Sequence, residues 1–224
     1  MQDTDRMQGE SQGYHLKELD IALSQDNPHR IMPAIPERSH LVLDVGCGAG
    51  QTLIASETKS GSIACGVDCD LEALRLGKKL DGNIHFVCAL GEELPFKKDC
   101  FDFAICRVSL PYMDIPISLS EMGRVTKSGG RVWLVLHPFS MVLRRLFQKV
   151  KSLDVRDSLY TIYVLTNGLL LHLQGKQCRF PFNRKRCESF QTRRSITRQL
   201  RCAGFDNVEI ERGRFFIVMA EKVG

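Results

Sequence analysis

Five short apolar runs alternate with segments of helical spacing between residues 40 and 138. The runs are HLVLDVGCG, SIACGVD, NIHFVCAL, FDFAICRVSL and RVWLVLHP, beginning at residues 40, 62, 83, 101 and 131. Such nearly continuous runs are typical of strands buried on both faces of a parallel sheet. Helices are predicted at 51–58, 71–80 and 114–126, so the pattern predicts an α/β fold with a doubly wound, Rossmann-like sheet.

The segment before the first strand is predicted to hold one helix. Residues 14–24, YHLKELDIALS, place Leu16, Leu19 and Leu23 at helical spacing. The preceding residues 1–13 are polar, and we expect them to be disordered. They have neither the apolar stretch of a signal peptide nor the Arg-rich character of a transit peptide.

The tail of the chain breaks the alternation of strands and helices. Residues 140–151 have the pattern of a basic helix, and two apolar runs on either side of Asn167-Gly168 predict a β-hairpin. Thr192 is predicted to cap a helix that ends at Gly204. The last apolar runs predict an antiparallel strand pair.

Composition restricts the class of protein. A chain of 224 residues suits one domain with a sizeable core, and we expect a single domain over residues 1–224. No apolar run reaches 18 residues, so no membrane span is expected. The nine cysteines are odd in number and show no metal-ligand spacing. They predict reduced thiols in a cytoplasmic protein, with no metal site.

Positive charge is concentrated near the end of the chain. The formal net charge is +5, and the segment from Lys176 to Arg201 carries nine Lys or Arg and one acid. That segment therefore has a net charge of +8, which leaves −3 for the rest. Such a segment is most often a solvated helix face, but it can also meet an anionic substrate or a nucleic acid.

The first strand leads into the glycine-rich loop Asp44-Val45-Gly46-Cys47-Gly48-Ala49-Gly50. In an open α/β sheet, ligands bind beyond the carboxyl ends of the strands. Gly46 permits a tight turn there, and Gly48 lets a ligand approach the backbone. The spacing G-x-G-x-G differs from the dinucleotide fingerprint G-x-G-x-x-G. The Asp44 carboxylate would repel a pyrophosphate, whereas it can accept a hydrogen bond from an ammonium group.

A second carboxylate, Asp68, ends the next predicted strand, 24 residues after Asp44. An acid at this position can accept hydrogen bonds from both hydroxyls of a ribose. The structural alternative is that Asp68 caps the helix that follows. Asp70 is better placed for that role.

Four stretches in this order resemble one family: LVLDVGCGAG, GVDCDLEAL, GEELPFKKDCFDFAIC and EMGRVTKSGGRVWLVL. The chain is identified as a member of the class I S-adenosylmethionine-dependent methyltransferases, of the broad small-molecule type. The resemblance covers residues 41–136, and the tail AGFDNVEIERGRFFIVMAEK resembles the final strand pair of the family. It implies a seven-stranded, mostly parallel sheet whose last strand is antiparallel.

The resemblance also assigns the cofactor-binding residues. Asp44, Gly46 and Gly48 would hold the methionine end of the cofactor, and Asp68 would hold the ribose. The adenine would lie against Cys69 and between Leu90 and Gly91. The remaining two members of the set are Cys47, within the glycine loop, and Cys106, whose backbone carbonyl would face the sulfonium. Many relatives carry an acid at the position of Leu90, so Glu92, a backbone group or apolar contact must serve the adenine amine here.

The acceptor side is less clearly marked. His137 ends the fifth strand, where it is a candidate general base, although a polar loop residue is the simpler interpretation. Ser109-Leu110-Pro111-Tyr112 resembles the motif of enzymes that methylate amide or base nitrogens, but its second position is Leu instead of Pro. In this family an N-terminal helix can cover the cofactor, so Tyr14 or His15 is a candidate substrate contact, although an amphipathic packing helix explains these residues equally well.

Residues 139–191 lie where this family usually builds acceptor specificity, and we expect a small helix and hairpin insertion there. Arg179, Arg184 and Arg186 can clamp a carboxylate or phosphate. The leucines of the predicted hairpin form either its core or an acceptor pocket; they are Leu169, Leu170, Leu171 and Leu173.

The expected function is therefore methyl transfer from S-adenosylmethionine to a small or medium-sized acceptor, for which the basic residues favour an anion. Two alternatives remain open. A nucleic-acid or protein methyltransferase would use the basic segment 176–201, although no RNA-binding module is recognisable. A non-catalytic partner subunit would keep the fold without the activity.

Overall fold

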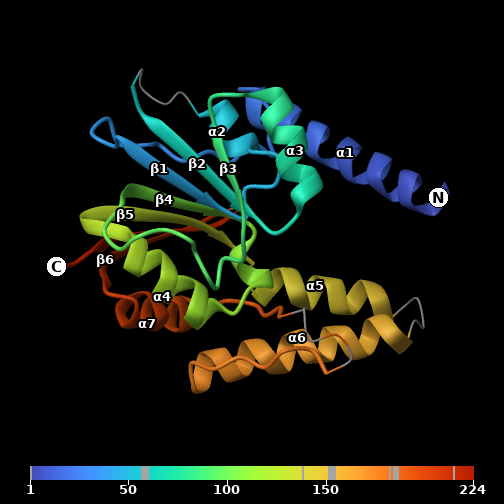
Figure 1. The fold of residues 1–224 in the computed structure, drawn as a ribbon. Helices are drawn as coiled ribbons and strands as arrows, with labels where there is room; N and C mark the ends of the chain where they lie inside the picture. The colour runs from blue at the N-terminus through green and yellow to red at the C-terminus, as the bar shows by residue number, and fades with distance from the viewer. Residues whose placement is uncertain are drawn as a thin grey trace.

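A seven-stranded sheet forms the centre of the protein in the computed structural model (Figure 1). The structure describes residues 2–56, 61–137, 139–150, 155–181, 183, 187–213 and 215–224. The strands are β1 (Leu41–Val45), β2 (Ile63–Asp68), β3 (His85–Cys88), β4 (Phe101–Arg107), β5 (Thr126–Leu136), β6 (Phe205–Arg212) and β7 (Phe216–Lys222). The five predicted apolar runs thus form the first five strands.

The strand order is β3-β2-β1-β4-β5-β7-β6. The strands from β3 to β5 pair in parallel, whereas β7 pairs antiparallel with both β5 and β6. The chain winds outward in one direction from β1 to β3 and then returns to add β4 on the other side. This reversal is the topological switch point, where ligands of open α/β sheets bind. The predicted fold class is confirmed.

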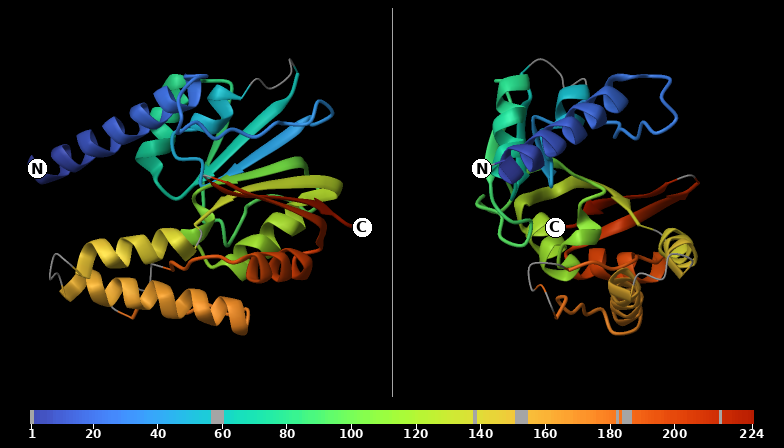
Figure 2. Two further views of the ribbon diagram at one scale, coloured as in Figure 1. Left: turned by 180° about the vertical axis from the view of Figure 1, so that it is seen from behind. Right: turned by 90° about the vertical axis from the view of Figure 1, so that its right-hand side faces the viewer.

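Helices cover both faces of the sheet (Figure 2). They are α1 (Gln2–Leu23), α2 (Gln51–Ala55), α3 (Leu71–Leu80), α4 (Ile115–Val125), α5 (Phe139–Val150), α6 (Val155–Leu173) and α7 (Arg193–Cys202), with a 3₁₀ turn at Leu110–Tyr112. One face carries α1, α2 and α3, and the other carries α4 and α7 (Figure 1). No helix in the described parts of the chain is long and apolar enough to cross a membrane.

Two apolar cores hold these layers together. The larger one joins the sheet to α4 and α7 through fully buried side chains such as Leu119 and Leu200, and the smaller one joins the opposite face to Leu53 of α2. Two of the helices begin at the predicted caps. The Asp70 carboxylate accepts hydrogen bonds from the backbone N–H groups of Glu72 and Ala73, and Thr192 forms a capping box at the start of α7.

The hairpin predicted around Asn167-Gly168 is wrong, because both residues lie inside the helix α6. In this helix, Asn167 and Gly168 make tertiary contacts instead of a turn. The Asn167 side chain donates to the Glu188 carbonyl at 2.9 Å and accepts from the Cys178 backbone N–H at 2.7 Å. Gly168 allows close packing, since a Cβ placed on it would come within 2.2 Å of the Phe190 ring. The insertion at 139–191 therefore contains the helices α5 and α6, which lie side by side.

The N-terminal helix is longer than predicted. It begins at Gln2 and ends at Leu23, so it includes most of the segment 1–13 that we expected to be disordered. That segment contains no proline, and several of its residues favour helices, so it can extend a helix whose later turns pack on α2. Figure 1 shows α1 and α5 on the two sides of the edge at which the parallel strands end.

Candidate functional site

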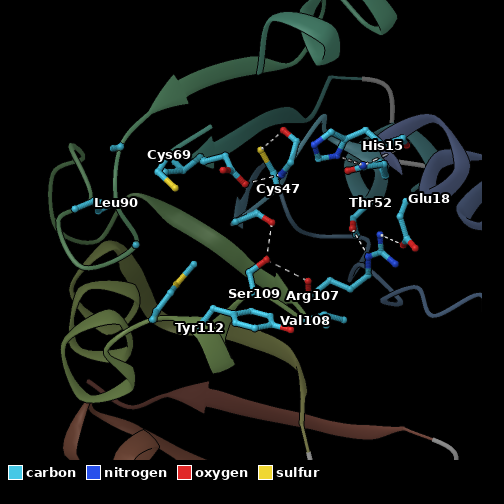
Figure 3. A pocket seen from close by; sticks show the side chains of 18 of the residues that line it. His15, Glu18, Cys47, Thr52, Cys69, Leu90, Arg107, Val108, Ser109 and Tyr112 are labelled. Carbon is cyan, nitrogen blue, oxygen red and sulfur yellow. Dashed lines mark hydrogen bonds and ion pairs between the residues drawn. The ribbon is translucent and has the colours of Figure 1, made fainter. Parts of the chain in front are cut away.

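The carboxyl ends of the parallel strands open into a cavity of about 710 Å³ (Figure 3). This volume lies in the range of roughly 300–1,000 Å³ that is usual for small-molecule sites. The wall consists of the glycine loop after β1, the segments after β2 and β3, the end of β4 and the helix α1. Sequence reasoning predicted the site at this edge of the sheet.

The glycine loop is shaped by backbone conformation and by close neighbours. Gly46 and Gly48 have φ values of 74° and 55°, which favour glycine. A Cβ on Gly46 would lie 2.3 Å from the Cβ of Ser109, and a Cβ on Gly48 would lie 2.9 Å from the His15 ring. The Ser109 hydroxyl donates to the Gly46 carbonyl at 2.8 Å. Both glycines are therefore required by their backbone conformation and by the side chains of Ser109 and His15 that pack against them.

Asp68 joins the glycine loop to the end of β2. One carboxylate oxygen accepts from the Gly48 backbone N–H at 2.8 Å, and the other accepts from the Asp70 backbone N–H at 2.9 Å. Asp70, and not Asp68, is the cap of α3. Each oxygen of a carboxylate has two lone pairs, so Asp68 can still accept hydrogen bonds from a ligand in the cavity.

Asp44 is buried beneath the glycine loop with only 1% of its surface exposed. Neither of its carboxylate oxygens has a hydrogen-bond partner among the described residues. Burial raises the pKa of this carboxyl from 3.8 to about 7; the Arg107 guanidinium and the neighbouring Thr52 hydroxyl oppose this rise, and Asp68 reinforces it. A buried carboxylate without a partner is costly unless a ligand supplies one. An ammonium group fits this requirement.

Arg107 lies at the end of β4, and its side chain forms part of the cavity wall (Figure 3). Its Nε–H donates to the Thr52 hydroxyl at 3.0 Å, and its Nη2 lies 3.4 Å from the Glu18 carboxylate. The side chain is only 12% exposed. Sequence reasoning did not name Arg107 as a site residue. The sequence does carry a signal for it, because a lone cation follows the apolar run of residues 103–106 at the ligand-binding edge.

The helix α1 contacts the glycine loop from the other side. The Gln51 side chain shares a hydrogen bond of 2.9 Å with Nδ1 of His15. Tyr14, His15 and Glu18 all belong to the cavity wall. The structure therefore places the start of the predicted N-terminal helix at the site, as the resemblance implied.

The residues predicted to surround the adenine lie on one part of the wall. Cys69, Leu90 and Gly91 all line the cavity, and Leu90 is exposed. The Glu92 carboxylate accepts from the Asp114 backbone N–H at 3.0 Å and lies 3.9 Å from the Arg179 guanidinium. The Glu92 carboxylate therefore already has two partners within the protein. This weakens the expectation that it binds the adenine amine in place of an acid at position 90.

Other predicted site residues lie near the cavity but not on its wall. Cys106 is fully buried beneath it, so only its backbone carbonyl remains a candidate contact. His137 is buried as well, and its ring packs edge-on against Tyr112 with 5.2 Å between the ring centroids. The role of His137 as a general base remains a prediction, and its position behind Tyr112 gives that prediction no support.

Tyr112, Met113 and Arg179 also belong to the cavity wall. In the motif that begins at Ser109, the Ser109 hydroxyl donates to the Gly46 carbonyl of the glycine loop. Tyr112, the aromatic residue of the same motif, is exposed. Arg179 is one of the three arginines predicted to clamp an anion. Arg184 and Arg186 lie outside the described residues.

The leucines of α6 do not line the cavity. Leu171 is fully buried in the larger core, whereas Leu169 and Leu173 are exposed on the helix. The basic segment 176–201 likewise forms no single surface among its described side chains. Arg179 faces the cavity, Arg198 donates to the carbonyls of Leu171 and Leu173, and other members are exposed on α7.

The fold and the glycine-loop cavity define a Rossmann-like domain with a cavity of small-molecule size at its switch point. Residues 43–134 match the family model described as a methyltransferase domain. A ubiquinone/menaquinone biosynthesis C-methyltransferase of Rhizobium johnstonii is 36% identical over 151 residues, which are 62% of this chain and 55% of that protein. A malonyl-[acyl-carrier protein] O-methyltransferase of Herminiimonas arsenicoxydans is 35% identical over 103 residues, 46% of this chain and 38% of that protein.

Among solved structures, the complex between the Trm112 methyltransferase activator of Haloferax volcanii and a putative methyltransferase contains a similar chain. The TM-score is 0.61 at 16% identity, and the match covers 99% of this chain and 96% of that one. This likeness shows the fold. The match covers 55% of the length of the Rhizobium johnstonii relative, so the present chain spans about half of that protein. Residues 43–134 therefore belong to a methyltransferase domain, as the four stretches of the sequence predicted.

Proposed function

We propose that the chain transfers the methyl group of S-adenosylmethionine to a small acceptor that carries negative charge. The cofactor supplies a methyl group on a positively charged sulfonium. The observation that supports its binding here is the buried, unpartnered Asp44 carboxylate directly beneath a loop of close-packed glycines. The amino-acid end of the cofactor carries the ammonium group that such a carboxylate requires.

The charge of the site suits this cofactor. The cavity wall carries the acids Glu18, Asp68 and Glu92 and the bases Arg107 and Arg179, and Asp44 lies just below it. With all of these groups ionised, the acids outnumber the bases by two. S-adenosylmethionine has a net charge of +1, from a sulfonium, an ammonium and a carboxylate. The excess of acid therefore complements it.

The acceptor would occupy the part of the cavity between Tyr112 and Arg179. Tyr112 offers an exposed aromatic face, and Arg179 offers a guanidinium to a carboxylate or phosphate. Methyl transfer needs the acceptor atom held in line with the methyl group, and positioning can supply most of the rate enhancement. No side chain is assigned here as a general base, in keeping with the buried position of His137.

The relatives support a small acceptor only in general terms. One is named as a quinone-pathway C-methyltransferase and the other as an O-methyltransferase of a malonyl carrier protein. Their acceptors differ in the atom that is methylated. We therefore propose the anionic character of the acceptor from Arg179 and leave the acceptor atom to experiment.

The test is incubation of the protein with methyl-labelled cofactor and a small-molecule extract, followed by mass spectrometry. We expect a labelled anionic product with the wild type and none with the Gly46→Arg variant, which fills the glycine loop. The Arg179→Gln variant should raise KM for that acceptor roughly tenfold or more, since a charge-assisted hydrogen bond is lost. An uncharged product, or labelled macromolecules alone, would refute the proposed acceptor class.

A further inference from the structure

The helix α6 carries exposed apolar side chains along the face that points away from the protein interior. Four large side chains on this face are between 52% and 60% exposed, and the smaller Thr166 is exposed among them. We call this set the α6 stripe; its members are Leu159, Ile162, Thr166, Leu169 and Leu173. On the opposite face of the helix, Val164 and Leu171 are buried in apolar cores. None of the five described members of the stripe belongs to the cavity wall.

The α6 stripe has the spacing of a coiled-coil seam. Its members follow one another at intervals of three, four, three and four residues, so they form a single line along the helix. The partly exposed Leu165 and Leu170 flank this line. A helix that faces water normally carries charged residues on its outer face. Residues 158–174 contain no Asp, Glu, Lys or Arg, so this face is suited to pairing with another apolar surface.

We propose that the α6 stripe pairs with the α6 stripe of a second copy of this chain, antiparallel, about a two-fold axis beside Thr166. A two-fold interface needs a surface that is complementary to itself. The stripe meets this requirement, because its spacing is nearly symmetric about its central residue. Leu159 would lie opposite Leu173 of the partner subunit, and Ile162 would lie opposite Leu169 of the partner subunit.

Charge favours a second copy over other occupants. A charged group buried against an apolar line would lose its hydration without gaining an opposite charge, so the occupant must itself be uncharged. The α6 stripe of another copy is such a surface. A membrane surface fits less well, because helices that lie in a membrane interface carry Lys or Arg beside their apolar face, often with Trp. Residues 158–174 contain none of these three residue types.

The position of α6 leaves room for a second copy. The helix lies at the periphery of the molecule, beside α5 and away from the sheet (Figure 1 and Figure 2). A dimer would withdraw eight half-exposed apolar side chains from water, four from each copy. One helix pair covers less than the roughly 800 Å² per partner of a standard interface, so we expect a reversible dimer with a Kd on the order of 10 µM. This inference does not depend on the proposed function.

Sedimentation velocity of the full chain, from about 1 to about 300 µM, tests the inference. We expect the wild type to pass from monomer to dimer over this range. Leu169→Glu and Ile162→Lys should each weaken the dimer at least about 30-fold, because each buries a charge without a partner. Ile117→Lys alters a similarly exposed side chain on α4 and is the matched control, which should associate like the wild type. Thermal unfolding confirms that each variant is folded.

The combined Ile162→Lys and Leu169→Glu variant tests the antiparallel arrangement. In the proposed dimer the two substituted positions face each other twice, so opposite charges meet at both places. The doubly substituted chain should therefore recover a Kd within about tenfold of the wild-type value. In a parallel pair each substituted position would meet its own copy, and like charges would repel. A double variant that remains monomeric would overturn the proposed arrangement.

Two other results would overturn the inference. One is a wild-type dimer that neither single substitution weakens, since its interface would then lie elsewhere. The other is a wild type that stays monomeric at the highest concentration. If that monomer bound vesicles of phosphatidylcholine and phosphatidylglycerol, and Leu169→Glu did not, the α6 stripe would be a membrane-docking face instead.

Discussion

The buried carboxyl of Asp44 should make the protein less stable at high pH, and Asp44→Asn should remove this effect. Burial raises the pKa of the folded-state carboxyl to about 7, whereas its ordinary value is 3.8. The folded protein therefore holds this proton more tightly than the unfolded chain does. The free energy of unfolding consequently falls as the pH rises from about 4 to about 7, and the loss is complete above that range.

The size of the effect follows from these two pKa values. A difference of about three pKa units corresponds to about 4 kcal/mol in total. Between about pH 5 and about pH 8.5, the wild type should lose about 3 kcal/mol of unfolding free energy through this carboxyl. Because an amide stays neutral, Asp44→Asn should lack this part of the loss while keeping the pH dependence of every other group.

The assay is urea unfolding of wild type and variant at the two pH values, without cofactor. The quantity compared is the change in unfolding free energy between the two pH values. Asp20→Asn, which alters an exposed carboxylate of α1, is the control and should follow the wild type because it removes no buried charge. Equal pH-dependent losses in wild type and Asp44→Asn would refute the reasoning.

Two further predictions concern the insertion and the helix that follows it. Gly168→Ala should destabilise the protein by about 1–3 kcal/mol, because its methyl group would collide with the Phe190 ring; Gly13→Ala, with open space around it, should cause no loss in the same thermal unfolding assay. Thr192→Ala should cost about 1–2 kcal/mol, because the capping box with Ser195 is lost. A neutral Gly168→Ala would contradict the packing of α6, and a neutral Thr192→Ala would contradict the cap.

The elements predicted best are those in which local sequence and global fold agree. The strands that contain Asp44 and Asp68 are otherwise apolar because both faces of the sheet are covered. Asp70 and Thr192 cap the helices that they were predicted to cap, since capping depends on a few adjacent residues.

The errors arise where tertiary contacts override local signals. Asn167-Gly168 is a strong turn signal, yet its amide is satisfied by Cys178 and Glu188, and its glycine accommodates Phe190. These partners are distant in sequence, so no local pattern reveals them.

The candidate site shows the same division. Residues at strand ends could be located from the sequence, because the topology brings those ends to one edge. The contribution of α1 depended on the family resemblance, and Arg107 was overlooked because its partners Thr52 and Glu18 belong to two other elements. A cation that ends a buried strand at the ligand-binding edge deserves a place among candidate residues.

The most direct test of the account is calorimetric titration of S-adenosylhomocysteine, the demethylated product, into the wild type and two variants. The account predicts one site of micromolar affinity in the wild type. Asp68→Ala should weaken it, because a ribose acceptor at the end of β2 is lost, and Gly46→Arg should abolish it, because the side chain would enter the space taken by Ser109. Binding of equal strength in all three proteins, or none in the wild type, would contradict the central claim.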